Sequence, residues 1–230
     1  MNHIKTTGII LSRVDYGEAD RILTVLTPDH GKLSLMAKGV RRVKSKLAGG
    51  IELFSTSEIA FLPGKGSVST LVSTRLIKHY AHIVEDVDRT MLGYELLQML
   101  HKTTEDSPEP EYFTLLEHTF AALDDHTVPL DLVRAWFIAR LLALGGHAPN
   151  LQTTREGEKL SPDTTYQFDF DATAMTPRDG GPFGVDEIKF LRLLFAQDSA
   201  TPLAKVTAVE KLLKTSLPLV TTLRQLHLRN

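Results

Sequence analysis

The residues of this chain best suited to chemistry are six basic side chains within residues 31–50, a segment without any acidic residue. Four glycines interrupt the segment, so one continuous helix is excluded. Cations on a flexible loop suit a polyanion, because each phosphate that they contact releases condensed counterions and so strengthens binding. A solvated run of charge is the alternative interpretation. The residues predicted to contact nucleic acid are Lys32, Lys38, Arg41, Arg42, Lys44 and Lys46.

The charge of the chain is divided unevenly along its 230 residues. Residues 1–80 hold 12 Lys and Arg against 6 Asp and Glu, whereas the remainder holds 14 against 22. The net charge of −2 argues against a protein that coats DNA with its whole surface. A basic first third and an acidic remainder predict two domains with different partners, and the acidic part is where we expect protein contacts.

Catalysis and metal binding have little support in the sequence. There is no nucleophile motif, and Gly64-Lys65-Gly66-Ser67 lacks the full spacing of a phosphate-binding loop. The absence of cysteine excludes disulfides and thiolate metal sites. We therefore expect neither an enzyme nor a cofactor.

No apolar run approaches the ~18–20 residues that span a bilayer. No segment has the basic start and apolar middle of a signal peptide. These patterns predict a soluble protein of the cytoplasm.

Five extended runs must position the basic residues. Leu33, Leu35 and Ala37 alternate with Lys32, Ser34 and Met36, as in a strand with one buried face. Turn signals separate the runs, among them Pro63-Gly64-Lys65-Gly66, which predicts a hairpin loop. We predict strands over residues 8–14, 21–27, 32–38, 52–62 and 67–77. Five short strands fit a small closed barrel, so residues 1–80 are predicted to form an OB-fold nucleic-acid-binding domain with Phe61 in its core.

Helical periodicity replaces this pattern from about Asp86 onward. The predicted helical domain comprises residues 81–149 and 183–230, and Trp136 is interpreted as a core or domain-interface residue. The fold class is therefore α+β with several domains. Residues 150–182 interrupt the helices as a polar, extended insert.

The insert contains a weak repeat, Thr153-Thr-Arg-Glu-Gly157 and Thr176-Pro-Arg-Asp-Gly180. Two similar turns joined by a hairpin are the layout of a zinc ribbon, whose turns carry Cys-x-x-Cys. Thr and a single acidic residue stand in each turn where thiolates would be. Because Thr is a poor zinc ligand, we expect a zinc-ribbon-like insert without metal.

Several motifs resemble the family of the DNA repair protein RecO. They include Asp15-Tyr-Gly-Glu-Ala-Asp-Arg-Ile-Leu-Thr24, Thr27-Pro-Asp-His-Gly-Lys-Leu33 and Ala37-Lys-Gly-Val-Arg-Arg-Val-Lys-Ser-Lys-Leu47. The match is dense over residues 8–80 and thins to Arg140-Leu-Leu-Ala-Leu-Gly-Gly-His-Ala-Pro149 and the two turns of the insert. Many members carry four cysteines in that insert, so zinc is not carried over to this chain.

The resemblance implies a non-enzymatic recombination mediator, associated with the nucleoid, that binds single- and double-stranded DNA and anneals complementary strands. It implies RecR and single-strand-binding protein as partners, the latter through its acidic tail, and help in loading RecA. Within the motif, Tyr16, Gly17, Glu18 and Asp20 are interpreted as structural, with Asp20 paired to a barrel arginine. The alternatives are a generic OB-fold binder of single-stranded nucleic acid and a protein-interaction scaffold.

The cations outnumber the aromatic residues that the barrel could offer for base stacking, which are Tyr16, Phe54, Phe61 and Tyr80. We therefore expect binding dominated by charge rather than by stacking.

Overall fold

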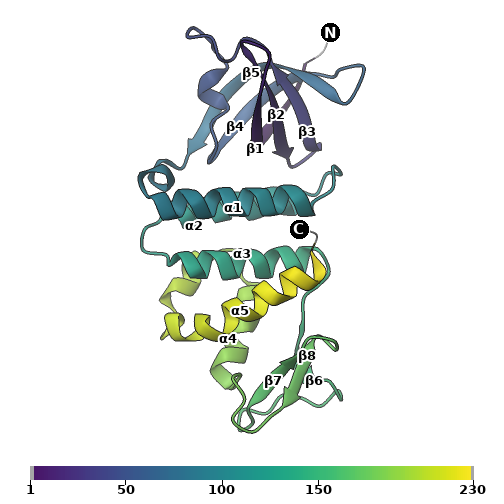
Figure 1. The fold of residues 1–230 in the computed structure, drawn as a ribbon, viewed down its shortest axis with the longest axis vertical. Coiled ribbons are helices and arrows are strands. Elements are labelled where there is room, and N and C mark those ends of the chain that lie inside the picture. The colour runs from purple at the N-terminus through teal and green to yellow at the C-terminus, as the bar shows by residue number, and fades with distance from the viewer. Residues whose placement is uncertain (1–2, 229–230) are drawn as a thin grey trace. The chain divides into compact units, whose positions relative to one another are not determined.

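The computed structural model describes residues 3–228 of the chain. Its first five strands form a closed barrel in the order β1-β2-β3-β5-β4 (Figure 1). The barrel and the helices that follow it confirm the predicted fold class. The strands are β1 Ile4–Tyr16, β2 Asp20–Thr27, β3 Gly31–Ala37, β4 Ser55–Leu62 and β5 Val68–His79.

The first strand, β1, serves two neighbours. Its beginning pairs with β4 up to Ile9, and its remainder pairs with β2 as far as Tyr16. The register shifts between Ile10 and Ser12, which exchanges the faces of the strand. Ile10 consequently lies in the core, whereas Ser12 and the alternate residues after it point outward.

Alternating apolar residues fill the barrel. Leu23, Leu35, Ile59 and Phe61 are at most 3 % exposed, which confirms the core position predicted for Phe61. The barrel closes through a short parallel pairing in which Ser34–Met36 of β3 lies beside Val68–Thr70 of β5.

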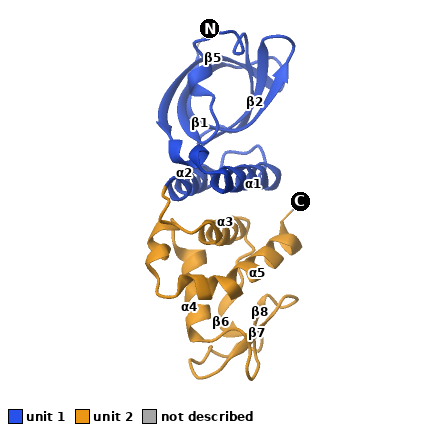
Figure 2. Ribbon diagram, turned by 60° about the vertical axis from the view of Figure 1, so that its left-hand side comes forward, with its two compact units in different colours: residues 1–124 blue, residues 125–230 orange. Residues whose placement is uncertain are grey.

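Two compact units make up the chain, residues 1–124 and residues 125–230 (Figure 2). The first unit contains the barrel, the short helix η2 (Ala81–Glu85), α1 (Val87–Thr103) and α2 (Pro110–Asp124). The compact units thus divide 44 residues after residue 80, where the sequence predicted the end of the barrel domain.

Aromatic packing explains why α1 and α2 belong with the barrel. The ring of Phe54 meets those of Tyr94 and Phe120 edge to face, with centroids 5.3 and 5.6 Å apart. Gly93 of α1 lies directly against the Phe54 ring, and any Cβ there would overlap it. Tyr80 contacts Phe120 in the same edge-to-face way. This cluster joins the end of the barrel to both helices.

The second unit contains α3 (Leu130–Leu144), α4 (Val185–Ala196), the short helix η3 (Thr201–Lys205) and α5 (Val209–His227). Between α3 and α4 lies a three-stranded sheet in the order β6-β8-β7. Its strands are β6 Asn150–Thr154, β7 Tyr166–Asp169 and β8 Ala174–Pro177. Trp136 of α3 is fully buried, and its indole N–H donates to the carbonyl of Gln197 at 2.8 Å, so it is a core residue of this unit.

The last helix runs through Pro218 without ending there. Leu213 and Val220, which lie on either side of this proline, are therefore buried residues of one helix. Among residues 3–228, none of the helices combines the length and apolar character that crossing a bilayer requires.

Candidate nucleic-acid interface

The basic segment, Lys38–Lys46, begins where β3 ends and is held by backbone contacts. The N–H of Gly39 donates to the Asp20 carboxylate at 2.6 Å, and the N–H of Arg41 donates to the carbonyl of Ala19 at 2.9 Å. Gly39 has a φ of 66°, a conformation that suits glycine. Asp20 therefore holds a backbone N–H of this segment, and the predicted pairing of Asp20 with an arginine was wrong.

The segment is also held beyond its other end. The hydroxyl of Thr74 on β5 donates to the carbonyl of Leu47 at 3.1 Å. Gly50, in the short helix η1 (Ala48–Gly50), lies so close to Thr74 that a Cβ would overlap it. Val40 is buried in the barrel core. The segment thus spans the barrel from the β1–β2 turn to β5, anchored mainly by its backbone and by the buried side chain of Val40.

Five of the six predicted cations lie on this segment and are exposed: Lys38, Arg41, Arg42, Lys44 and Lys46. Within residues 3–228, four of them have no ion-pair partner. The fifth, Arg41, lies 3.5 Å from the carboxylate of Asp15.

Asp15 already accepts a 2.8 Å hydrogen bond from Arg21. That bond and the charge of Arg41 lower the pKa of Asp15, although desolvation opposes them. Asp15 therefore stays ionised at neutral pH and offsets part of the charge of Arg41, so the free positive charge lies on the other four residues.

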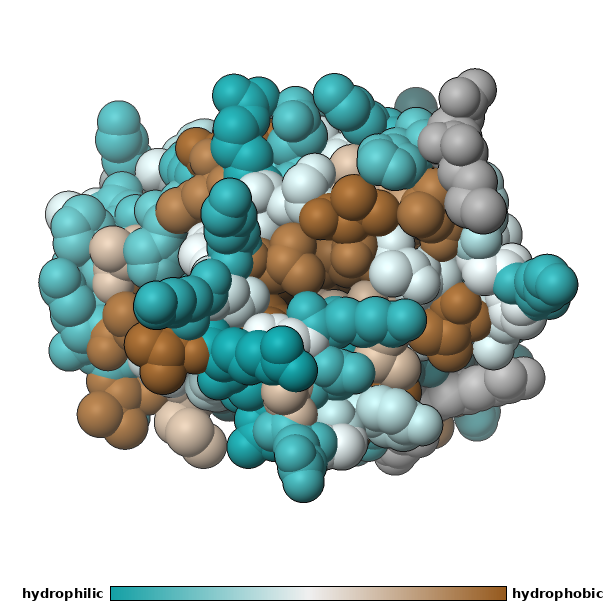
Figure 3. All heavy atoms as spheres, turned by 90° about the horizontal axis from the view of Figure 1, so that it is seen from above, coloured by the Kyte–Doolittle hydropathy of each residue, from teal (hydrophilic) through white to brown (hydrophobic). Residues whose placement is uncertain are grey.

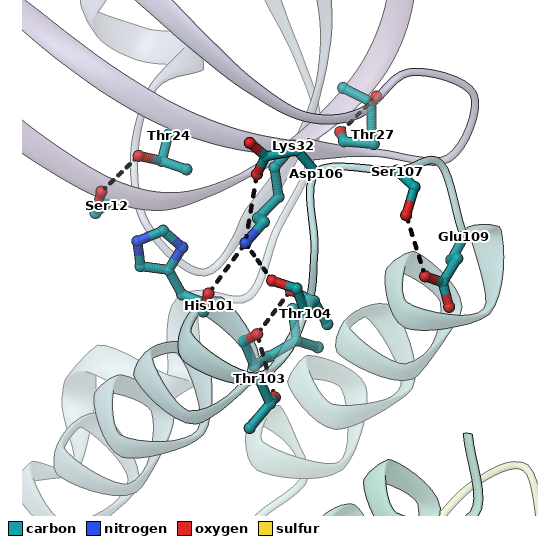
Figure 4. A network of polar contacts seen from close by, with 12 residues as sticks. Ser12, Thr24, Thr27, Lys32, His101, Thr103, Thr104, Asp106, Ser107 and Glu109 are labelled. Carbon is teal, nitrogen blue, oxygen red and sulfur yellow. Dashed lines mark hydrogen bonds and ion pairs between the residues drawn. The ribbon is translucent and has the colours of Figure 1, made fainter. Parts of the chain in front are cut away.

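Lys32 does not join this group. Its side chain is only 9 % exposed, and its ammonium donates to the carbonyls of His101 and Thr104 at 3.1 and 2.5 Å (Figure 4). The carboxylate of Asp106 lies 3.6 Å away. Because a cation at the C-terminal end of a helix stabilises its free carbonyls, Lys32 fastens β3 to the end of α1. We therefore place Lys32 outside the candidate interface.

Like the predicted cations, the aromatic residues of the barrel include both buried and exposed side chains. Phe54, Phe61 and Tyr80 are buried, whereas Tyr16 at the end of β1 is 55 % exposed. Val43, between two cations of the basic segment, is fully exposed.

On the face of the barrel seen in Figure 3, apolar side chains gather around a hollow and hydrophilic side chains surround them. The sequence interpretation of Tyr16 as structural did not anticipate its exposure.

Hydrogen bonds close the turns of the zinc-ribbon-like insert. The hydroxyl of Thr154 accepts from the N–H groups of Glu156 and Glu158, and the hydroxyl of Thr153 accepts from the Asn150 amide. Of these two residues, Thr153 stands where a ribbon carries a thiolate, and a hydroxyl that is a poor zinc ligand and already accepts from Asn150 does not fit a zinc ion. In the part of the chain that the structure describes, no three His, Asp or Glu side chains gather to hold a metal.

The carboxylate of Asp169 in the insert is likewise occupied. It accepts from the N–H groups of Asp171 and Ala172 and pairs with Arg155 at 3.0 Å. These contacts lower the pKa of Asp169, the hydrogen bond from Ala172 having the largest effect. The role of this carboxylate is to close the turn after β7.

Comparison with known proteins agrees with this arrangement. Residues 1–80 match the family model described as "Recombination protein O N terminal", and residues 84–230 match "Recombination protein O C terminal". A DNA repair protein RecO of Dehalococcoides mccartyi is 32 % identical over 201 residues, which cover 84 % of this chain and 79 % of that protein. The RecO protein of Rubrobacter xylanophilus is 28 % identical over 212 residues, covering 89 % and 84 %. The two family models together cover nearly the whole chain, and its barrel presents exposed cations. This chain belongs to the RecO family of DNA repair proteins.

Proposed function

We propose that this protein is a non-enzymatic recombination mediator that anneals complementary DNA strands and assists the loading of RecA. The observation that carries the proposal is the basic segment, a loop fixed by its backbone on which four exposed cations have no ion-pair partner among the described residues. RecR and single-strand-binding protein are the proposed protein partners. The acidic part of the chain after residue 80, whose excess of Asp and Glu lies in residues 81–124 (10 against 2 Lys and Arg), is the proposed place for their contacts, because like charge disfavours DNA there.

The chemistry of annealing suits such a loop. A protein that brings two strands together must neutralise two phosphate backbones while the base edges stay free to pair. Flexible Lys and Arg side chains contact phosphates without reading sequence. If the four free cations each contact a phosphate of single-stranded DNA, the slope of log K against log salt concentration is about −3.

The test is annealing of complementary strands coated with single-strand-binding protein. The variant replaces Lys38, Arg42, Lys44 and Lys46 with Ser. Its annealing rate should decrease strongly, and its slope of log K against log salt concentration should become much closer to zero. The matched control replaces four exposed lysines of the second unit with Ser: Lys159, Lys189, Lys205 and Lys214.

Equal annealing by the wild type and the basic-segment variant would remove the assigned role from this segment. A wild type that does not anneal would favour the protein-interaction scaffold. Annealing of bare strands but not of coated ones would contradict the proposed contact with single-strand-binding protein.

A further inference from the structure

The outer side of α1 begins with exposed apolar residues. Val87, Met91 and Tyr94 follow one another at spacings of four and three residues, so they lie on one side of the helix. Their exposed fractions are 77, 63 and 42 %. The opposite side of α1 carries the buried residues Leu96 and Leu100, which hold the helix in its unit without the outer side. Exposed apolar side chains that gather in this way mark interaction surfaces.

Acidic side chains border these apolar residues. Glu85 and Asp88 are both exposed, and within residues 3–228 neither has an ion-pair partner. Val84, which is 55 % exposed, lies just before them in η2. A partner for such a surface must offer an apolar side chain between positive charges. We name this surface the η2–α1 face, and it consists of Val84, Glu85, Val87, Asp88, Met91 and Tyr94.

The basic segment has the matching composition. Val43 is fully exposed, and its neighbours Arg42 and Lys44 are exposed cations without an ion-pair partner among the described residues. The methyl groups of a valine make no contact that a phosphate favours, so binding of a polyanion does not explain why an apolar residue stands at this place. An apolar side chain between two cations does match the η2–α1 face, in both polarity and sign of charge.

The two surfaces of one copy cannot meet each other. Lys32, at the start of β3, is held at the end of α1, whereas the basic segment begins at the opposite end of this seven-residue strand (Figure 1). The length of the strand separates them by about 20 Å. Main-chain hydrogen bonds from Gly39 and Arg41 keep the segment at its end of the barrel. The complementary surface must therefore come from another molecule.

We infer that the η2–α1 face is a docking site for the basic segment of a second copy of this chain. A contact between one loop and one helix side buries less than the ~1,200 Å² of a standard interface, so the association is weak and reversible. DNA phosphates take up the same cations, so DNA releases the copies from one another. This competition rests on the proposed function, whereas the contact between copies does not.

The test is sedimentation velocity of the full chain over a range of protein concentrations. At about 0.01 M salt, where charges act over ~30 Å, the average mass should rise with protein concentration. At about 1 M salt, where they act over ~3 Å, it should stay near that of the monomer.

Charge reversal identifies the two surfaces. One variant combines Arg42→Glu with Lys44→Glu, and the other combines Glu85→Lys with Asp88→Lys. Each should weaken self-association about tenfold at low salt, because attraction between exposed charges becomes repulsion. An equimolar mixture of the two variants should associate again, since the acidic segment of one then meets the basic face of the other.

Two further variants serve as a control and as a test of the apolar contact. The matched control combines Glu111→Lys with Asp131→Lys, which reverses exposed acidic residues in the first turns of α2 and α3, and it should associate like the wild type. Val43→Ser should weaken self-association several-fold and leave the affinity for oligothymidine unchanged. Circular dichroism verifies that each variant is folded.

Restored association in the mixture of reversed variants supports the inference. A wild type that stays monomeric at low salt overturns it. Association that survives either reversal, or a mixture that stays monomeric, also overturns it, because the copies then meet elsewhere. Loss of oligothymidine affinity in Val43→Ser with intact self-association would assign this valine to nucleic acid instead.

Adding oligothymidine separates this inference from the proposed function. Bound oligothymidine should return the wild type to the monomer. Association that persists with oligothymidine bound contradicts the docking of the basic segment. A wild type that self-associates as described but binds no oligothymidine contradicts the proposed function and leaves the contact between copies in place.

Discussion

Replacing Lys32 with Met should destabilise the first unit without weakening DNA binding through charge. The ammonium of Lys32 donates to two carbonyls at the end of α1 and lies close to Asp106. Hydrogen bonds to a charged group contribute ~1.5–3 kcal/mol each. Met keeps the buried apolar stem, and water can reach part of the freed helix end. We therefore expect the free energy of unfolding to fall by about 2–4 kcal/mol, a large share of the ~5–15 kcal/mol typical of a protein.

The position of the single tryptophan makes this measurement specific. Trp136 lies in the second unit, so its fluorescence reports that unit during urea unfolding. Circular dichroism reports both units. For Lys32→Met, the transition seen by circular dichroism should broaden or split toward lower urea, while the transition seen by tryptophan fluorescence moves less. Lys65→Met, in the exposed β4–β5 loop, is the matched control and should leave both transitions in place.

Salt dependence separates the two roles that Lys32 could have. A lysine that contacts a single-strand phosphate contributes about −0.7 to the slope of log K against log salt concentration. We expect the slope of folded Lys32→Met to equal that of the wild type. A shallower slope together with unchanged urea transitions would refute the assignment of Lys32 to the helix end.

Four further predictions follow from the contacts of the barrel unit and of the insert. Asp15→Asn removes the carboxylate beside Arg41 and should raise the affinity for oligothymidine up to about fivefold in a binding titration at low salt; lower affinity would contradict the partial neutralisation of Arg41. Gly31→Ala should lower the free energy of unfolding by about 2–4 kcal/mol, because Gly31 has a φ of 65° and a Cβ would overlap the carbonyl of Asp106; a stability like that of the wild type would show that the α1–α2 connection can yield. Burial, followed by the charge of Lys32, lowers the pKa of His101 below 6.5, so the unfolded chain binds the proton more tightly. Stability should fall as pH drops below about 6.5, and urea titrations of His101→Gln should show a weaker dependence; an equally steep one would assign the effect to other groups. A chelator should leave the melting temperature unchanged, since the hydroxyl of Thr154 closes the first turn of the insert, and a clear decrease would reveal a bound metal.

Local patterns account for most of the barrel. Turn signals and alternation place all five strands to within about four residues at their ends. The largest error at a strand start is in β1, which begins at Ile4 rather than Gly8. The start of β4 is at Ser55 rather than Glu52, because Phe54 adopts a φ of 54° and turns its ring toward the helices. The exchange of faces in β1 depends on a register shift that no spacing in the sequence reveals.

Long-range contacts decide what local patterns cannot. Alternation correctly places Lys32 on the outward side of β3, but its partners are 69 and 72 residues away at the end of a helix. The sequence is equally compatible with Tyr16 as a structural turn residue and with Tyr16 as an exposed aromatic side chain. Only the fold shows which aromatic rings are buried. The boundary between the two compact units is hidden for the same reason, since α1 and α2 share the helical period of the helices that follow.

Because the basic segment is anchored by its backbone, the conformation of this loop does not depend on how many charged side chains it carries. Gly39, Arg41 and Leu47 hold the loop through main-chain atoms, so the side chains at positions 38, 42, 44 and 46 take no part in keeping its course. Selection can therefore change the number of cations there one at a time with little effect on folding. Under the proposed function, an engineer could tune the DNA affinity at these same positions, one cation at a time, without altering the fold of the loop.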